Sequence, residues 1–187
     1  MKKTIKFILL IAIIIGGISC NNKANLAPQD GPKLKIGDVY YGGAVFYVEP
    51  SGKHGLVVNF DGGSTVVWAP YSAITGATQD TLYAGLNNTN LLASFFGSAT
   101  CAARKCYDKV SYDYNDWYLP SKYELNLLRL QNKSLPTYYQ LNEGSYYWSS
   151  TEFSSTQAWR QLISATTLNQ SKASKTGSNY YVAIRRF

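Results

Sequence analysis

Shortages of particular residue types limit what this sequence can encode. Charged side chains make up only 16% of the 187 residues and hydrophobic ones 45%, so the chain can bury a core and is not disordered as a whole. No glycine triplet or heptad repeat runs through it, which excludes a collagen-like chain and a coiled coil. The one histidine, His54, falls in a polar turn, and the motifs of serine hydrolases, zinc proteases and phosphate-binding loops are missing. We therefore expect no catalytic site.

The positive net charge is mild. The formal charge of +7 comes from 18 Lys and Arg against 11 Asp and Glu. Lys2, Lys3 and Lys6 lie in a segment that we expect to be removed, which leaves 15 basic and 11 acidic residues, or +4. A nucleic-acid-binding protein needs a concentrated basic face, so no nucleic-acid partner is expected.

The first twenty residues are typical of a bacterial lipoprotein signal. A basic start is followed by an apolar run over residues 7–18, which is too short to span a bilayer, since that takes about 20 residues. The small residues from Gly17 to Ser19 lead into Cys20 and resemble a lipobox. This resemblance implies a signal peptide at 1–19 and a lipid on Cys20 that fastens the protein to a membrane. An ordinary signal peptide with an incidental cysteine is the alternative.

The rest of the chain divides into a tether and one domain. Residues 20–36 are polar and contain Pro28 and Pro32, which predicts a flexible tether. Residues 37–187 have the apolar content of a folded domain. We expect localisation in the bacterial cell envelope through the lipid anchor, with the outer membrane favoured and the leaflet left open.

Within the domain, strands are predicted at both ends and helices between them, which is an α+β order. Residues 40–48 and 55–60 form a hairpin pattern, and 66–68 could extend the same sheet. A helical pattern over 88–109 places Leu91, Leu92, Phe95 and Phe96 on one stripe, with Gly97 interrupting it. The later segments are a helix at 121–131, strands at 146–150, 158–163 and 180–187, and an exposed hairpin or loop at 164–179.

The helix at 121–131 has the clearest local signal. Ser121 and Glu124 form a capping box, in which the Ser121 hydroxyl accepts from the Glu124 amide and the Glu124 carboxylate accepts from the Ser121 amide. Leu125 and Leu128 then give the helix an apolar face.

Seven stretches of the domain form an ordered set: 42–48, 52–57, 102–106, 116–125, 147–152, 158–159 and 182–187. Taken together and in order, they resemble the domain of unknown function 1566 group, the C-terminal domain of the Legionella collagen-like adhesin and its relatives. The resemblance covers 37–187, although no collagen-like stalk precedes the domain here. It implies a C-type-lectin-like fold, in which an antiparallel sheet joins the N- and C-terminal strands beside two helices and a long-loop region. The order of the predicted elements agrees with this fold, since 44–48 could pair with 181–185. The resemblance also implies an adhesin role toward sulfated polysaccharides.

Two sets of acidic residues could carry chemistry but have simpler explanations. The cluster of Asp108, Asp113, Asn115 and Asp116 could offer oxygens to calcium, but its spacing is not that of an EF-hand, and Asx turns explain it. Two of three glutamates could in principle form the catalytic carboxylate pair of a glycosidase, but the capping box already explains one of them. We expect no metal, no cofactor and no catalytic residue. The three glutamates are Glu124, Glu143 and Glu152.

Two cysteines remain in the domain. Five residues apart on a continuous helix, Cys101 and Cys106 are too far apart to bridge, so we expect two thiols with Cys106 buried. A disulfide would need a break in the helix. Formylglycine-generating enzymes share the lectin-like fold and use a cysteine pair, which makes oxidation chemistry the enzyme alternative.

Tyrosines and basic residues are the best candidates for ligand contacts. We expect Trp68, Trp117, Trp148 and Trp159 to pack in the core rather than stack on sugars. Exposed tyrosines, including the pair Tyr138 and Tyr139, are better candidates. The residues after 100 carry 11 basic and 6 acidic side chains, an excess of five that includes Arg185 and Arg186. The predicted ligand-binding residues are Arg104, Lys105, Lys109, Lys172, Lys175, Tyr112 and Tyr114.

The sequence thus predicts a membrane-anchored, non-catalytic binding module of the adhesin type. Its ligand would be an anionic or sulfated extracellular glycan, because Arg and Lys form charge-assisted hydrogen bonds with sulfate and carboxylate groups. A solvated basic face without a ligand is the simpler alternative. The alternative function is a protein-binding accessory subunit of a cell-envelope assembly, which an apolar, salt-insensitive interface would favour.

Overall fold

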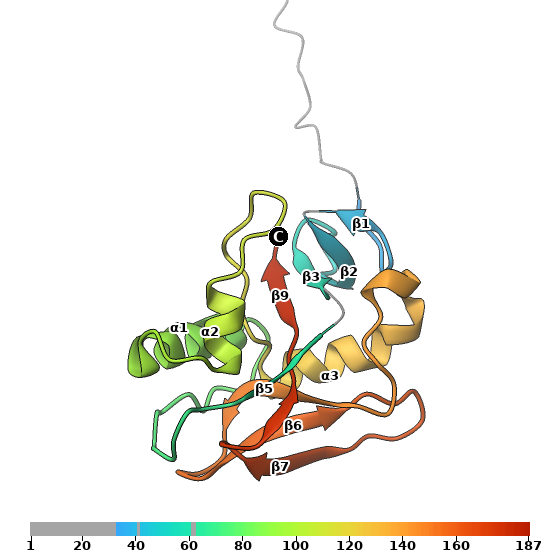
Figure 1. The fold of residues 1–187 in the computed structure, drawn as a ribbon. Helices are drawn as coiled ribbons and strands as arrows, with labels where there is room; N and C mark the ends of the chain where they lie inside the picture. Colours follow the sequence, from blue (N-terminus) through green and yellow to red (C-terminus); the bar gives the residue numbers. More distant parts are fainter. Residues whose placement is uncertain (1–32, 41, 61–62) are drawn as a thin grey trace, which may run out of the picture.

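The computed structural model describes residues 33–40, 42–60 and 63–187, and it has an α+β fold with two sheets (Figure 1). The predicted signal peptide, Cys20 and most of the predicted tether lie outside the described residues. In the described part no helix is long and apolar enough to cross a membrane. The first sheet contains, in spatial order, β1 (Val39–Tyr40), β2 (Gly43–Val48), β3 (Gly55–Asn59) and β9 (Ala183–Arg186).

The first sheet joins the two ends of the domain, but not through the predicted pair of strands. All its pairings are antiparallel, and β1 and β9 belong to the same sheet. The last strand pairs with β3, with Val58 opposite Ile184, so the expected pairing of 44–48 with 181–185 is wrong. β2 is already hydrogen-bonded on both sides, to β1 and β3, so β9 cannot pair with β2 and lies at the far edge of β3 instead.

The second sheet crosses below the first in Figure 1 and collects segments from across the chain. Residues 66–68 do not extend the first sheet, because β4 pairs with β8 in the second one. The stretch 164–179, predicted as an exposed hairpin or loop, contains β7, which forms a hairpin with β6, and the start of β8. In spatial order this sheet contains β4 (Thr65–Val67), β8 (Ser178–Tyr180), β5 (Tyr146–Glu152), β6 (Gln157–Leu162) and β7 (Gln170–Ser174).

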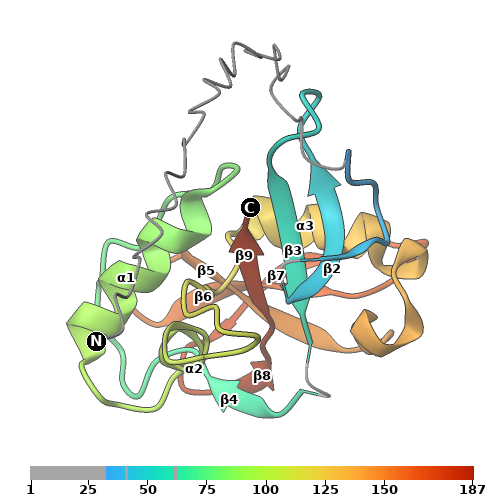
Figure 2. The same cartoon turned by 90° about the horizontal axis from the view of Figure 1, so that it is seen from above.

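Three α-helices occur in the described residues, where the sequence predicted two. The predicted helix over 88–109 is α1 (Ala84–Phe96) and α2 (Ala102–Tyr107), because Gly97 ends α1 at a positive φ of 58° and Cys101 is extended. α3 (Lys122–Gln131) matches its prediction and packs against strands of both sheets. In Figure 2, α1 lies at the opposite side of the molecule from β2 and β3. Two short 3-10 helices, η1 (Asn132–Ser134) and η2 (Thr137–Tyr139), follow α3.

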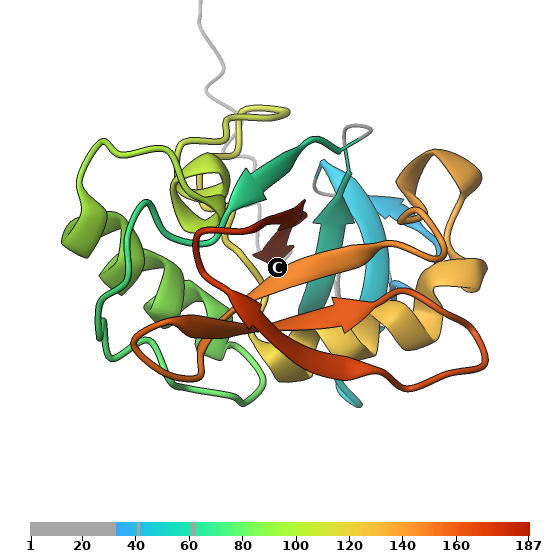
Figure 3. The same cartoon turned by 60° about the horizontal axis from the view of Figure 1, so that its bottom comes forward.

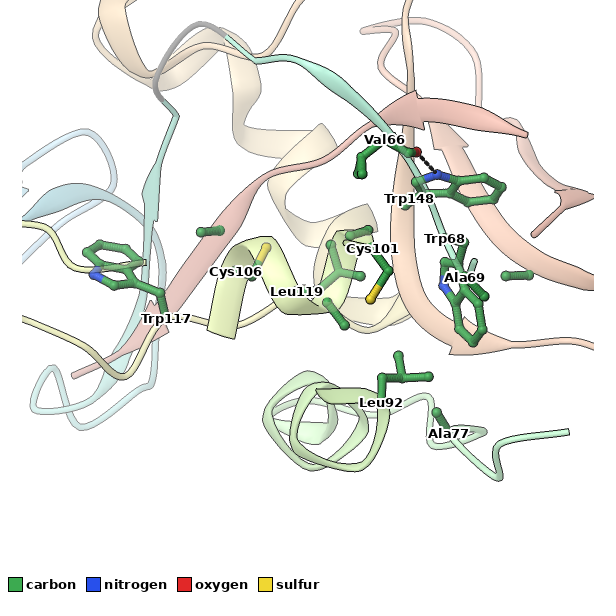
Figure 4. Close-up of a cluster of buried hydrophobic side chains, with 14 of the residues drawn as sticks. Val66, Trp68, Ala69, Ala77, Leu92, Cys101, Cys106, Trp117, Leu119 and Trp148 are labelled. Carbon is green, nitrogen blue, oxygen red and sulfur yellow. Dashed lines mark hydrogen bonds between the residues drawn. The ribbon is translucent and has the colours of Figure 1, made fainter. Parts of the chain in front are cut away.

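The core is rich in tryptophan. Trp68, Trp117 and Trp148 are fully buried, as predicted. The Trp148 Nε1–H donates to the Val66 carbonyl at 2.9 Å (Figure 4). The Trp68 Nε1–H donates to the Ser149 carbonyl at 2.7 Å, so both of these buried indoles have hydrogen-bond partners. Their side chains, with others from α1, α2 and both sheets, form one of two hydrophobic clusters.

Packing also reaches back into the last part of the predicted tether. Leu34 and Ile36 lie against the core clusters, and the Gly37 amide donates to the Val45 carbonyl. The folded unit therefore includes residues from 34 onward.

The capping box forms as predicted, and Glu124 does more than cap α3. Its carboxylate accepts from the Ser121 amide at 2.8 Å and from the Tyr118 hydroxyl at 3.0 Å. The same carboxylate accepts from the Tyr83 amide at 2.8 Å and the Gly85 amide at 3.1 Å, where α1 begins. Glu124 thus fixes the start of α3 against the start of α1. Glycine is needed at position 85, since a Cβ there would lie 2.4 Å from the Glu124 carboxylate.

Candidate functional site

Four of the predicted ligand-binding residues lie together on α2 and on the loop that follows it. A surface depression of about 310 Å³ opens beside this loop, between α2 and the ends of β3 and β9. Its lining contains two of the predicted lysines. We call the four predicted residues the lysine–tyrosine face: Lys105, Lys109, Tyr112 and Tyr114. The depression is lined by Asn59, Lys105, Asp108, Lys109, Val110, Tyr181 and Ala183.

A strained turn presents Tyr112. Ser111 and Tyr114 exchange both backbone hydrogen bonds, and the two residues between them, Tyr112 and Asp113, have positive φ values of 53° and 64°. Such a two-residue turn normally contains Asn-Gly, because residues other than Gly, Asn and Asp disfavour a positive φ. The turn nevertheless leaves Tyr112 69% exposed. Backbone strain of this kind is concentrated at functional sites.

Asn59 holds this turn in place, and the sequence analysis missed it. Its Nδ2 donates to the Gly42 carbonyl at 2.7 Å and to the Ser111 hydroxyl at 3.1 Å. A Cβ at Gly42 would lie 3.2 Å from Tyr112 and Tyr114, so the turn packs tightly on the backbone between β1 and β2. The available signal was a polar residue that ends an otherwise apolar strand.

Three of the predicted contact tyrosines lie close together, but Tyr139, which was expected to be exposed, is buried. The Tyr112 side chain hydrogen-bonds that of Tyr139, and burial, with the nearby Tyr112, raises the pKa of Tyr139. The rings of Tyr138 and Tyr139 lie 5.2 Å apart, edge to face, and Tyr138 is exposed. Tyr114 differs, because the Arg185 guanidinium stacks 3.6 Å from its ring centroid and covers one ring face.

Arg104 and two of the acidic residues near the loop form ion pairs. Arg104 pairs with Asp108 at 2.6 Å and donates to the Gly97 carbonyl, so its guanidinium braces α2 against the end of α1. Arg185 pairs with Asp116. Two members of the possible calcium cluster thus contact arginines, and the part of the chain that the structure describes has no group of three or more potential metal ligands.

Lys175 is not a surface cation, which corrects one predicted ligand residue. Its side chain is fully buried, where its ammonium pairs with Glu152, donates to the Ala73 carbonyl and lies 4.7 Å from the Trp68 ring centroid. The prediction treated 164–179 as an exposed hairpin. The turn after β7 instead returns inward, and the Lys175 carbonyl accepts from the amides of Trp68 and Ala69.

Lys172 is exposed but lies far from the lysine–tyrosine face. It belongs to β7, at the opposite end of the molecule from the 108–116 loop in Figures 1 and 3. Its ammonium lies 3.9 Å from the Phe153 ring centroid and 5.2 Å from that of Trp159. Lys122 covers the same Trp159 ring at 4.5 Å, so this half-buried tryptophan is shielded by two lysines instead of being open for sugar stacking.

The cysteines and the histidine do not form a reactive site. Cys101 and Cys106 are both buried and not bridged to each other, as predicted (Figure 4). Burial raises the pKa of the Cys101 thiol, which disfavours the nucleophilic thiolate. His54 is exposed near the C-terminus, with its Nδ1 3.3 Å from the Phe187 carbonyl oxygen.

The three candidate glutamates have separate structural roles. Burial raises the pKa of Glu124, which accepts four hydrogen bonds at the helix starts. Glu143 is exposed and pairs with Lys133. Burial alone would raise the pKa of Glu152, but hydrogen bonds from Lys175 and two backbone amides hold it below its usual value. Each carboxylate is thus engaged in contacts that hold the fold together.

Comparisons with known proteins bear on the fold. No family model matches the sequence, and no curated protein matches it either. Among solved structures, a fimbrial protein from Bacteroides ovatus ATCC 8483 is similar, with a TM-score of 0.61 at 18% sequence identity. The match covers 81% of this chain and 48% of that one, so this chain spans about half the length of its structural neighbour. At this identity the likeness shows a shared fold alone.

Proposed function

We propose that the chain is a lipid-anchored, non-catalytic binding module of the bacterial cell surface, which recognises an anionic glycan through the lysine–tyrosine face. The observation that carries the proposal is that Lys105 and Lys109 line one surface depression, while the loop that follows them exposes Tyr112. Lysine ammonium groups can pair with sulfate or carboxylate, while the tyrosines offer rings and hydroxyls to the sugar.

The state of the site favours binding over catalysis. In the described residues, the cysteines are buried and the candidate carboxylates form structural pairs or caps. The strained turn keeps Tyr112 exposed without a partner molecule, so little ordering is needed when a ligand arrives.

The fold and the structural neighbour support an envelope role. The antiparallel sheet that joins both ends of the domain agrees with a C-type-lectin-like fold and with the domain of unknown function 1566 resemblance. We propose both assignments on that ground. The similar structure is that of a fimbrial protein, which fits a surface location and an adhesin role for this chain. Lipidation of Cys20 would place the domain there.

Glycan binding tests the proposal directly. Residues 21–187 would be applied to an array of neutral, carboxylated and sulfated glycans, with and without calcium. We expect binding to acidic glycans that does not depend on calcium. For heparin as the probe, Lys105→Ala with Lys109→Ala should weaken affinity about tenfold, since two exposed ion pairs contribute about 0.7 kcal/mol each.

A charge-matched control separates a site from a general attraction. Lys172→Ala removes one positive charge at the opposite end of the molecule and should leave heparin affinity within about twofold of the unaltered protein. If no acidic glycan is bound, or if Lys172→Ala weakens binding as much as Lys105→Ala alone, the proposed site is wrong.

A further inference from the structure

The outer side of α1 and the loop before it expose a second surface, which is apolar. Tyr71 packs edge-on against Phe96, with ring centroids 5.4 Å apart, and Phe95 lies 5.0 Å from Phe96. A Cβ at Gly76 would lie 3.8 Å from Leu91, so the loop and the helix are in contact. We call this surface the α1 face: Tyr71 (53% exposed), Ile74 (65%), Leu91 (42%) and Phe95 (44%).

The α1 face lies in a stretch with almost no charge. Between residues 63 and 103 the only charged residue is Asp80, which pairs with Lys122 at 2.9 Å. Along α1 the exposed positions follow one helical stripe and are all uncharged. Depletion of charge together with enrichment in aromatic residues is the signature of the core of a protein interface. The stripe consists of Asn87, Asn90, Leu91, Ser94 and Phe95.

A buried ion pair holds Ile74 in its exposed position. The Lys175 ammonium donates to the carbonyl of Ala73, and the Glu152 carboxylate accepts from the amides of Thr75 at 2.9 Å and Gly76 at 2.9 Å. The backbone on both sides of Ile74 is therefore fixed, and its side chain is directed to solvent. Burying two charges costs several kcal/mol per ion before pairing offsets it.

The loop is also tied directly to the helix. The Gln79 amide donates to Asn88 Oδ1 at 3.3 Å, and the Asn88 Nδ2 donates to the Gln79 carbonyl at 2.8 Å. Figure 3 shows the loop running beside α1 at one side of the molecule. The apolar side chains are thus presented by a braced scaffold, and preorganisation of this kind lowers the entropic cost of association.

We infer that the α1 face is the contact surface of a homodimer, in which it packs against the same face of a second copy. Each copy has more basic than acidic residues, 18 against 11, so two copies repel each other least where they meet through a face without charged side chains. The uncharged face has no such repulsion. In a dimer with two-fold symmetry the same surface patch of both copies forms the interface, and this is the commonest arrangement of homo-oligomers.

The contact is small, so the dimer is weak. The 13 residues of α1 span about 20 Å, which gives a patch of a few hundred Å² per copy, at the low end of specific interfaces. A dissociation constant of roughly 10–300 μM is expected for such an interface. The inference does not depend on the glycan site, which lies on another part of the surface.

Sedimentation velocity of residues 21–187 tests this inference. That segment contains every described helix and strand and both core clusters, and it lacks Cys20. From about 5 to 500 μM protein, the sedimentation coefficient should rise from that of a monomer to that of a dimer. Raising salt from about 0.05 to 0.5 M should not weaken the dimer, because the contact contains no ion pairs.

Two variants on separate elements and one matched control make the test specific. Leu91→Glu on α1 and Ile74→Glu in the loop should each raise the dissociation constant at least tenfold, with circular dichroism confirming the fold. Leu168→Glu alters a leucine that is 64% exposed in a different loop and should change nothing. A monomer at all concentrations, or a dimer that survives both α1-face variants, would overturn the inference.

Discussion

Replacing Lys175 by methionine should destabilise the fold more than any surface substitution. The Lys175 ammonium pairs with Glu152, donates to the Ala73 carbonyl and lies over the Trp68 ring. Methionine keeps most of the side-chain volume but removes the charge. Glu152 is then left as a buried carboxylate with backbone amides as its remaining donors.

The expected loss can be estimated from those contacts. Removing one partner of a buried ion pair costs about 3–5 kcal/mol of unfolding free energy. The amides of Thr75 and Gly76 still donate to Glu152, so we expect the lower end, about 3 kcal/mol. Adding Glu152→Gln removes the uncompensated charge and should restore at least half of the loss. Exposed Lys172→Met is the matched control and should change stability by less than about 0.5 kcal/mol.

The effect should also depend on pH, with a definite sign. The pKa of Glu152 is lowered in the folded protein, so its contribution is present above the unfolded pKa and is lost as the pH falls through the folded value. In Lys175→Met the carboxyl loses its cation, and its pKa must rise. The stability difference between the two proteins should therefore shrink below about pH 4.

Urea unfolding followed by circular dichroism, at pH 7 and at pH 3.5, measures these differences. Hydrogen exchange at the amides of Thr75 and Gly76 adds a local reading, since both should exchange faster in Lys175→Met. A Lys175→Met protein within 0.5 kcal/mol of the unaltered one at pH 7 would refute the assigned role of the pair.

Two further substitutions test local features of the fold. Ser121→Ala should lower the unfolding free energy by about 1–2 kcal/mol in urea titrations, because the hydroxyl caps α3 and also donates to the Thr81 carbonyl. An unchanged midpoint would refute the capping role. Tyr112→Asn with Asp113→Gly should raise stability by about 1 kcal/mol, because both residues have positive φ, while weakening heparin binding. An increase in both stability and affinity would show that Tyr112 makes no contact with the glycan.

Local signals in the sequence were sufficient for part of the fold. The capping box fixed the start of α3 because both of its hydrogen bonds form within four residues. The α+β order also followed from the arrangement of strands and helices. The order of the strands in the first sheet could not be predicted from the sequence. β2 has β1 on one side and β3 on the other, so β9 pairs with β3 and not with β2.

The same division between local and long-range information applies to the site. Lys105 and Lys109 could be grouped from the sequence because they lie in one short helix and directly after it, and both line the depression. Lys175 was misplaced because its partner, Glu152, is distant in sequence and its burial depends on the β6–β7 hairpin. The four apolar residues of the predicted stripe do not distinguish buried from exposed positions. Leu91 faces solvent because the neighbouring elements, α2 and the loop that precedes α1, cover only part of that helix.

The salt dependence of heparin affinity is the most direct test of the proposed glycan site. Exposed ion pairs are screened within about 10 Å at 0.1 M salt, so affinity should fall at least tenfold between about 0.05 and 0.5 M. Lys105→Ala with Lys109→Ala should flatten that decline, whereas Lys172→Ala should follow the unaltered protein. Affinity that does not respond to salt, or a decline that the double variant leaves unchanged, would contradict recognition through the lysine–tyrosine face.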